Sequence, residues 1–162
     1  MAVNFYLKLE GITGESQDTT HGGEIEVMSW SFNETQSATA HEGTGSAGGR
    51  VSVGDMHFVK KADLSTVPLL QYCTTGKHVP TAMLSCYKAA GDGSRVKYLQ
   101  YDLTKVYISS IQQGGSDGTE VPTESFSLNF ATFKTTYKQQ NPDGTEGAAP
   151  DFGWDIPANT TL

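Results

Sequence analysis

A glycine-rich segment is the first pattern in this sequence whose residue spacing could do chemistry. Gly43, Gly45 and Gly48 match the Gly-x-Gly-x-x-Gly fingerprint. In that fingerprint, backbone N–H groups and a helix N-terminus hold the pyrophosphate of a dinucleotide. The chemistry requires a strand before the glycines and a helix after them. Here a polar loop precedes them and the strand-like run Arg50–Val53 follows, so we interpret the segment as a loop and expect no nucleotide cofactor.

Histidines and cysteines, which could ligate a metal or act as nucleophiles, also lack the spacings that such chemistry needs. The histidines are His21, His41, His57 and His78. No two of them are spaced i, i+4 on a helix, none belongs to a zinc motif, and the chain has no Gly-x-Ser-x-Gly elbow. Cys73 and Cys86 lie in apolar patterns, which favours buried structural thiols. We therefore expect no catalytic residue, no metal and no cofactor, and we expect that the protein is not an enzyme.

The elements that would position these residues are mostly β-strands. Val3 to Leu9 alternates apolar and polar residues, which is the period of a strand. A second strand covers about residues 24–32, and its apolar residues change face midway, so we expect a bulge or cover on both sides. A later run alternates from Ser125 to Phe130. The predicted core residues of these strands are Phe5, Leu7, Met28, Trp30, Phe32, Phe126, Leu128 and Phe130.

One short helix is predicted among the strands. Ser65 or Asp63 can cap its N-terminus, and Gly76 can end it. The apolar residues at helical spacing are Val67, Leu70 and Cys73. About seven or eight strands with a single helix predict a mainly β fold, a closed β-barrel or sandwich. We expect residues 1–162 to form one domain.

The composition of the chain argues against several classes of partner. The chain has 162 residues and a net charge of −7, which argues against nucleic acid or an anionic membrane as a main partner. No apolar run approaches the length of a membrane span. The N-terminus has neither a basic region nor an apolar run of the signal-peptide kind. We expect a protein that stays in the cytoplasm or leaves it by a route that reads no such signal.

A long polar loop and surplus apolar strand faces together favour self-association. Residues 35–50 are rich in Gly, Ser, Thr and Ala, and loops of this length in compact domains are often functional. Several strands carry apolar groups on both faces, which a single domain cannot easily cover. Contact with identical copies would cover them.

The sequence resembles the Hcp (hemolysin-coregulated protein) family, the tube protein of bacterial type VI secretion systems. The ordered combination of matching segments spans nearly the whole chain. These segments are Phe5–Lys8, Gly11–Ser16, Asp18, His21, Glu24–Phe32, Pro68–Leu70, Cys73, Gly76–His78, Tyr98, Leu99, Val106–Ser110, Glu124–Phe130, Gly153–Asp155 and Asn159. Phe32 stands where the family commonly has tryptophan.

The resemblance implies a β-barrel with one flanking helix, related to phage tail-tube proteins, that assembles into hexameric rings. The rings would stack into a tube inside a contractile sheath, and contraction would expel the tube, with its spike, carrying effectors. The lumen would also hold and stabilise effectors. The protein would be cytoplasmic before assembly and secreted afterwards. No toxin domain is expected after the closing motif.

Two surfaces are assigned on this basis as hypotheses. If Trp30 and Phe32 point into the barrel, Ser29 and Ser31 point away from it and would line the lumen and contact cargo. Residues 35–50 would join stacked rings. The residues of this predicted stacking loop are Thr39, His41, Glu42, Gly43, Gly45, Gly48 and Gly49.

Three other functions stay open at the level of sequence. A phage tail-tube subunit would share the predicted fold. A carbohydrate-binding module would need Trp30 or Trp154 exposed on a flat face. An enzyme of an unfamiliar type would need a polar cluster that only folding brings together.

Overall fold

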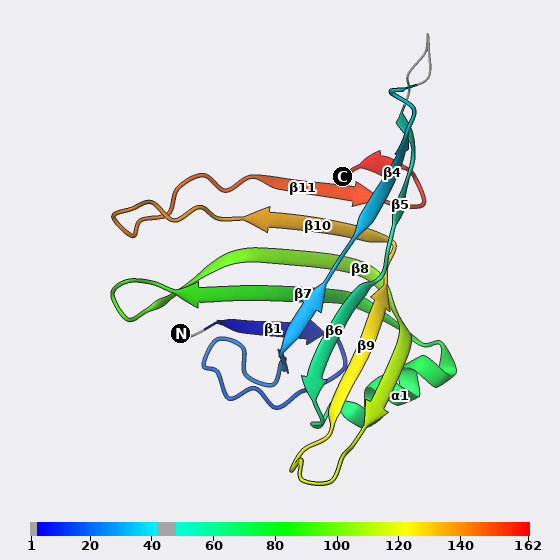
Figure 1. Ribbon diagram of the computed structural model, residues 1–162, viewed down its shortest axis with the longest axis vertical. Helices are drawn as coiled ribbons and strands as arrows, with labels where there is room; N and C mark the ends of the chain where they lie inside the picture. Colours follow the sequence, from blue (N-terminus) through cyan, green and yellow to red (C-terminus); the bar gives the residue numbers. More distant parts are fainter. Residues whose placement is uncertain (1–2, 42–47) are drawn as a thin grey trace.

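The backbone is mostly β-strand with one short helix, as the sequence predicts (Figure 1). The computed structural model describes residues 3–41 and 48–162. The strands are β1 (Asn4–Leu9), β2 (Ile25–Val27), β3 (Ser29–Ser31), β4 (Glu34–Ala38), β5 (Gly48–Val53), β6 (Met56–Lys61), β7 (His78–Ala89), β8 (Arg95–Gly114), β9 (Thr123–Asn129), β10 (Thr132–Tyr137), β11 (Asp151–Asp155) and β12 (Thr160–Thr161), and the helix is α1 (Thr66–Thr75).

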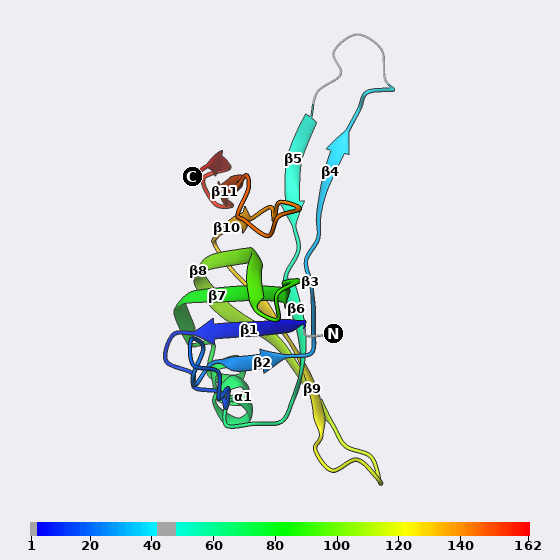
Figure 2. The same ribbon diagram turned by 90° about the vertical axis from the view of Figure 1, so that its left-hand side faces the viewer.

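The 20-residue strand β8 joins two layers of antiparallel strands. Its first half pairs with β7 and β10, up to Thr104 opposite Thr132, and its second half pairs with β9 from Tyr107 onward. Between these halves Lys105 has φ 51°, in the left-handed region that non-glycine residues seldom occupy. The strand bends there, so one layer (β1, β7, β8, β10, β11) lies across the other (β3, β6, β9), as Figures 1 and 2 show.

The sheet is open between β2 and β3, in contrast to the closed barrel that we expected. β2 pairs with β1, whereas β3 pairs with β6, and Met28 alone separates the two strands. The predicted change of face falls at this residue. Ile25 and Val27 before it are buried, and Trp30 after it also packs on the core. The irregularity thus turns both apolar sets toward one core.

The prediction that Met28 belongs to the core is wrong. Its side chain is 53 % exposed, because the backbone irregularity that turns its neighbours inward leaves this residue outside. The other predicted core residues lie in or against the core between the two layers. The buried ones are Leu7, Phe126, Leu128 and Phe130, and the partly buried ones are Phe5, Trp30 and Phe32.

Helix α1 begins and ends where the sequence predicts, but it docks through a different side. Gly76 follows it in the left-handed conformation, with φ 70°. Leu69 is fully buried, with Tyr72 and Cys73 packed beside it. Val67 is 71 % exposed and Leu70 is 45 % exposed, so the predicted stripe of Val67, Leu70 and Cys73 contributes only Cys73 to the contact.

The predicted polar loop of residues 35–50 is largely a two-stranded ribbon. β4 pairs with β5, from Glu34 opposite Val53 to Ala38 opposite Gly48. The ribbon projects away from the two layers (Figure 2). Gly49 allows its strands to approach, since a Cβ there would lie 2.3 Å from the Ser37 hydroxyl. The small residues that suggested a loop instead permit close pairing.

Candidate functional site

One sheet face is rich in hydroxyl groups, and we call it the serine face. It is the side of β3, β6, β9 and the second half of β8 that points away from the core. Its residues are Ser29, Ser31, His57, Ser109, Ser110 and Ser125, together with Ser127, which is itself buried and whose hydroxyl contacts those of Ser109 and Ser110. The alternation of the strands produces it, because Phe58, Phe126 and Leu128 between these residues point into the core.

Register aligns the serine face across neighbouring strands. Ser31 lies opposite His57, which in turn lies opposite Ser127. Ser29 lies opposite Val59, which lies opposite Ser125. The first row therefore presents hydroxyls and one imidazole, which can both donate and accept hydrogen bonds, whereas the second row has the half-buried apolar side chain of Val59 between its two serines.

A hydrogen-bond network fixes one end of the serine face. The Ser109 hydroxyl donates to Asp55 Oδ2 at 2.7 Å and lies 2.7 Å from the hydroxyl of Ser127. Asn129 Nδ2 donates to Asp55 Oδ1 at 2.9 Å. Because Asp55 accepts from two strands, the hydroxyls beside it are held in place. The face at this end is rigid and polar.

The two predicted lumen residues lie on the serine face. Ser29 and Ser31 are exposed on β3, while Trp30 between them packs against the core. Sequence reasoning did not assign His57, Ser109 or Ser127 to this surface. The alternation of Ser125 to Phe130 carried that signal for β9, but only the strand pairing shows which strands lie beside β3.

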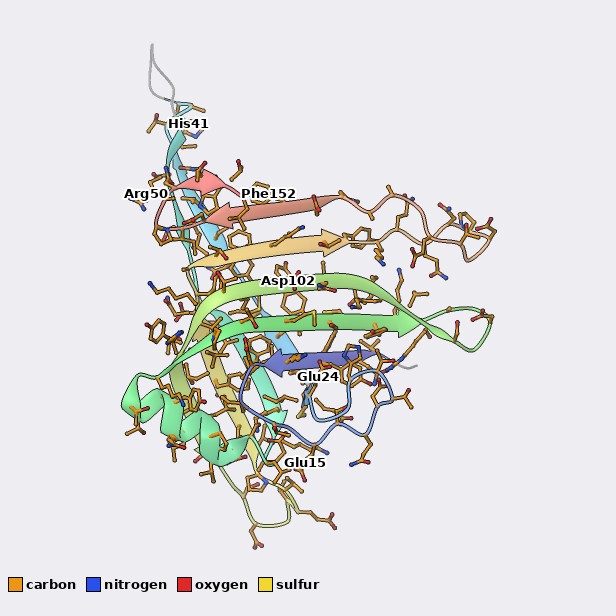
Figure 3. The ribbon with its side chains drawn as sticks, turned by 180° about the vertical axis from the view of Figure 1, so that it is seen from behind. Glu15, Glu24, His41, Arg50, Asp102 and Phe152 are labelled. Carbon is orange, nitrogen blue, oxygen red and sulfur yellow. The ribbon has the colours of Figure 1, made fainter. Side chains whose placement is uncertain are left out.

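Some of the predicted stacking residues lie on the described ribbon, and the others lie outside the described residues. Thr39 and His41 follow β4, and Gly48 and Gly49 begin β5. Figure 3 shows His41 and Arg50 on this ribbon. The predicted residues Glu42, Gly43 and Gly45 lie outside the described residues. Arg50 Nη2 donates to the carbonyl of Ile156 at 3.2 Å, which ties the ribbon to the end of β11.

A buried histidine holds the 10–24 loop against the sheet. His21 is only 4 % exposed, and its Nδ1 lies 2.8 Å from Glu24 Oε2. Its Nε2 lies 2.6 Å from the hydroxyl of Tyr87 on β7. The imidazole stacks on Tyr6 of β1, with ring centroids 4.7 Å apart. Both ring nitrogens therefore have partners, so this histidine has a structural role rather than that of a free ligand.

Arg95, at the start of β8, also holds the 10–24 loop against the sheet. It donates to the Tyr6 hydroxyl at 2.8 Å and forms an ion pair with Asp18. Burial raises the pKa of the Asp18 carboxyl, but backbone N–H donors of His21 and Thr20, together with Arg95, outweigh burial and leave that pKa below its ordinary value. Asp18 is therefore ionised at neutral pH, and the ion pair with Arg95 persists there.

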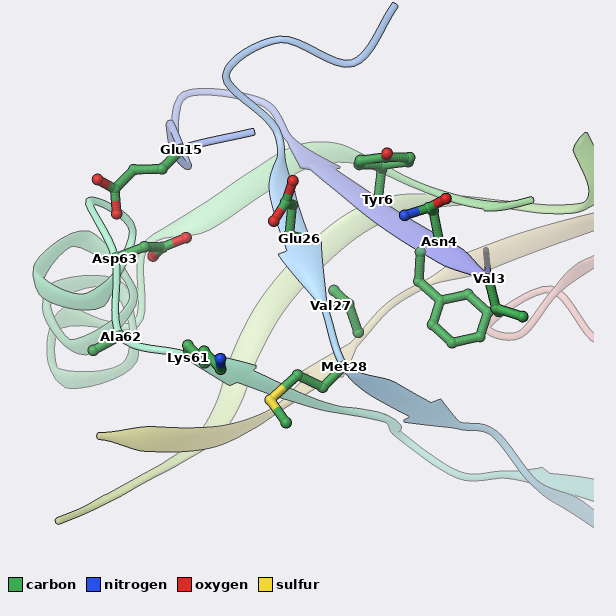
Figure 4. Close-up of a pocket in the computed structure, with 11 residues that line it drawn as sticks. Val3, Asn4, Tyr6, Glu15, Glu26, Val27, Met28, Lys61, Ala62 and Asp63 are labelled. Carbon is green, nitrogen blue, oxygen red and sulfur yellow. The ribbon is translucent and has the colours of Figure 1, made fainter. Parts of the chain in front are cut away.

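A pocket of about 380 Å³ lies between β1, β2 and the connection from β6 to α1. Figure 4 shows Glu15 and Asp63 at one end and Val3 at the other. Glu15 Oε2 accepts from the Leu64 backbone N–H at 3.1 Å, and Asp63 Oδ1 accepts from Lys60 at 2.9 Å. These two carboxylates are thus engaged in structural bonds.

The candidate chemical residues remain apart from one another. In the described part of the chain, no group of three or more His, Cys, Asp or Glu side chains could hold a metal ion. Cys86 is fully buried, and burial raises the pKa of its thiol to about 12, so it is protonated at neutral pH. Neither cysteine forms a disulfide.

Among residues 3–41 and 48–162, no helix has both the length and the apolar character needed to traverse a lipid bilayer.

Fold and surface together define a mainly β protein whose distinctive features are a broad serine face and a projecting ribbon. Residues 6–137 match the family model described as "Type VI secretion system effector, Hcp". The chain is 41 % identical to Protein hcp1 of Pseudomonas aeruginosa over 160 residues, covering 98 % of each chain. This protein belongs to the Hcp family.

Solved structures give the same relationship. Hcp1 from Salmonella typhimurium matches with a TM-score of 0.82 and 36 % identity, over 100 % of both chains. A structure described as a type six secretion system protein matches with a TM-score of 0.91 and 27 % identity, over 99 % of this chain and 100 % of that one. A type VI secretion system effector from Yersinia pestis has a TM-score of 0.76 and 27 % identity, over 94 % of this chain and 99 % of that one.

Proposed function

We propose that this protein is the structural subunit of a type VI secretion tube, in which hexameric rings stack and are expelled with effectors. Membership of the Hcp family over nearly the whole chain is the observation that carries the proposal. The role is mechanical rather than enzymatic, and residues 1–162 act as one tube domain. The protein is cytoplasmic before assembly and secreted afterwards, and its partners are its own copies, the contractile sheath, the spike and secreted effectors.

We infer further that the strands curl into a barrel around Met28. The Met28 backbone N–H donates to the carbonyl of Val59 on β6 at 2.7 Å. Since β2 pairs with β1 and β3 pairs with β6, this bond bridges the point at which the sheet opens. Closure there would leave no unpaired edge between the two layers.

The serine face is proposed as the lumen wall, with Ser29 and Ser31 in contact with cargo. Asp55 and Lys61 stand at the two ends of β6, and the residues between them that face outward carry no acid, Lys or Arg. Hydroxyls and an imidazole form exchangeable hydrogen bonds without a strong charge of one sign. Such a wall suits cargo that must enter, be held and leave.

The ribbon is proposed to join one ring to the next. An isolated two-stranded hairpin is marginally stable in water, so a projecting one gains stability from a partner. All five residues of β4 are exposed, which leaves that strand available to a neighbouring copy. Thr39, His41, Gly48 and Gly49 lie near its outer end.

Native mass spectrometry and electron microscopy test the assembly. The unmodified chain is expected to give a hexamer mass and, at high concentration, stacked rings. A variant with residues 40–47 replaced by a two-residue Asn-Gly turn should keep the ring mass but lose the stacks, because the β4–β5 pairs remain while the outer end is removed. A stable monomer at high concentration would refute the tube proposal, and stacks of normal length in the shortened variant would refute the role of the ribbon.

Ser31→Trp tests the lumen. The indole would occupy the surface above His57, so co-purification of a small effector expressed with the chain is expected to fall about tenfold or more, a change of about 1.4 kcal/mol in binding. Ser116→Trp is the matched control, because Ser116 is exposed in the β8–β9 turn and away from the serine face. Both variants should retain the ring mass. Equal effector recovery from the two variants would show that Ser31 does not face the cargo.

A further inference from the structure

The bend of β8 presents a lysine that has no acidic partner. Lys105 is exposed, and no carboxylate of residues 3–41 and 48–162 lies within ion-pair distance of its ammonium group. Its backbone φ of 51° is unfavourable for a residue with a Cβ. β7 and β8 keep their register across this point, with Val79 opposite Val106 and Thr81 opposite Thr104, and Lys105 between them has no paired residue. The backbone conformation therefore directs this lysine away from the ladder.

Lys105 lines a pocket of mixed polar and apolar character, of about 290 Å³, where β5, β8, β9 and the end of β11 meet. The other lining residues are Val53, Gly54, Tyr107, Asn129, Phe130, Ala131, Ile156 and Pro157. Among the described residues that line this pocket, Lys105 alone is charged. A ligand for this pocket would therefore combine small apolar groups with a negative charge.

On the opposite side of the molecule, the chain between β10 and β11 forms a projecting tongue, which we define as residues 138–150. Its two arms are held by backbone bonds, among them Gln139 N–H to the Ala148 carbonyl at 2.8 Å and Asn141 N–H to the Thr145 carbonyl at 2.8 Å. At its tip, Gly144 N–H donates to the Asn141 carbonyl at 2.9 Å across a turn. The tongue is thus ordered before it meets any partner.

The tongue is acidic at its tip. Asp143 and Glu146 are its carboxylates, and both are exposed. Hydrogen bonds from the Thr145 side chain and backbone lower the pKa of Asp143, which keeps it ionised. The single lysine of the tongue, Lys138, lies at its base, 3.7 Å from Glu146. The remaining residues near the tip are small or proline, which suits a shallow pocket.

The two surfaces face opposite ways. Figure 1 shows the tongue, in orange, extending to one side from β10 and β11, whereas β8, β9 and β10 meet at the corner on the other side. One chain cannot bring its own tongue to its own pocket. Two copies in the same orientation can bring a tongue and a pocket together, because the tongue of each copy then faces the pocket of the next.

We propose that the pocket beside Lys105 receives the acidic tongue of a second copy of this chain. The contact is head-to-tail, so it either closes within a ring or repeats along a stack. It rests on the proposed tube function and adds the two surfaces that meet. The ammonium group of Lys105 would pair with Asp143 or Glu146 of the neighbouring copy while the tip covers the apolar residues of the lining.

Charge reversal tests the contact by analytical ultracentrifugation and electron microscopy of the full chain. Lys105→Glu and Glu146→Lys are each expected to weaken association about tenfold or more, because like charges then meet. Asp143→Asn should weaken it less, since an amide retains the acceptor for Thr145 but loses the charge. The double variant Lys105→Glu with Glu146→Lys should restore part of the association, because positions 105 and 146 again carry opposite charges while Asp143 keeps its negative charge. Lys8→Glu, an equal charge change at an exposed site on β1, should leave association unchanged.

Thermal unfolding of each variant shows whether it is folded. If the ring mass is lost, the contact lies within the ring; if the ring mass remains and the stacks shorten, the contact lies between rings. Association of Lys105→Glu equal to that of the unmodified chain would overturn the proposal, as would a double variant no better than its singles. A monomeric unmodified chain is a different result, because it would refute the tube function itself.

Discussion

Glu124→Gln is expected to lower the free energy of unfolding by about 3 kcal/mol, because it removes the more deeply buried of the two carboxylates that pair with the buried Lys60. Lys60 is fully buried on β6, and its Nζ lies 2.6 Å from Glu124 Oε2 on β9 and 2.9 Å from Asp63 Oδ1 before α1. The pair joins two strands to the start of the helix. Loss of one member therefore loosens three elements at once.

Chemical denaturation measures this effect, and a drop of roughly 10 °C in melting temperature should accompany it. The control is the double variant Lys60→Met with Glu124→Leu, which replaces the pair by apolar groups and is expected to recover most of the loss. Lys61→Met, at the exposed neighbouring position, should change stability by less than about 0.5 kcal/mol. A cost below about 1 kcal/mol for Glu124→Gln would mean that solvent reaches Lys60.

Gly14→Ala is expected to destabilise the protein by about 3 kcal/mol through crowding. A Cβ on Gly14 would lie 2.5 Å from the carbonyl oxygen of Glu24 and 2.8 Å from the Cα of Ile25. Both atoms belong to backbone, which cannot rotate away as a side chain can. The 10–24 loop would have to lift from the sheet, taking His21 away from Tyr87.

Hydrogen exchange and thermal unfolding together check this prediction. Amides of the loop and of β1 should exchange faster in Gly14→Ala, in addition to the lower melting temperature. Gly91→Ala is the matched control, because a Cβ there meets nothing within 4 Å, and it should leave both measurements nearly unchanged. Unaltered exchange in the loop of Gly14→Ala would contradict the close crossing of residues 14 and 24.

Local sequence signals predicted the elements whose cause is local. Gly76 ends α1 because the left-handed backbone conformation at that one residue is enough to stop the helix. The alternation of apolar and polar residues around Phe126 identifies β9 without information from any other strand. The prediction that Met28 is buried failed because a change in the face of the apolar residues has two explanations. The strand is either buried on both faces or interrupted by a backbone irregularity, and the sequence does not distinguish them. The prediction that Val67 packs on the sheet failed because helical spacing shows which residues share one side of the helix but not which side meets the sheet.

The serine face was predictable only in part for the same reason. Ser29 and Ser31 followed from the position of Trp30 in one strand. His57 and Ser127 required the register of β3, β6 and β9, which depends on contacts far apart in the chain. Residues 35–50 were read as a loop because glycine and serine favour turns, whereas at Gly49 the missing side chain serves strand pairing.

The continuity of β8 through both layers has a mechanical consequence. Because one strand is hydrogen-bonded to β7 and β10 at one end and to β9 at the other, neither layer can tilt without straining the other through a shared covalent backbone. A load applied to the serine face is thereby transmitted to the outer strands as tension along β8. The subunit would respond to sudden acceleration as one stiff body rather than as two sliding plates.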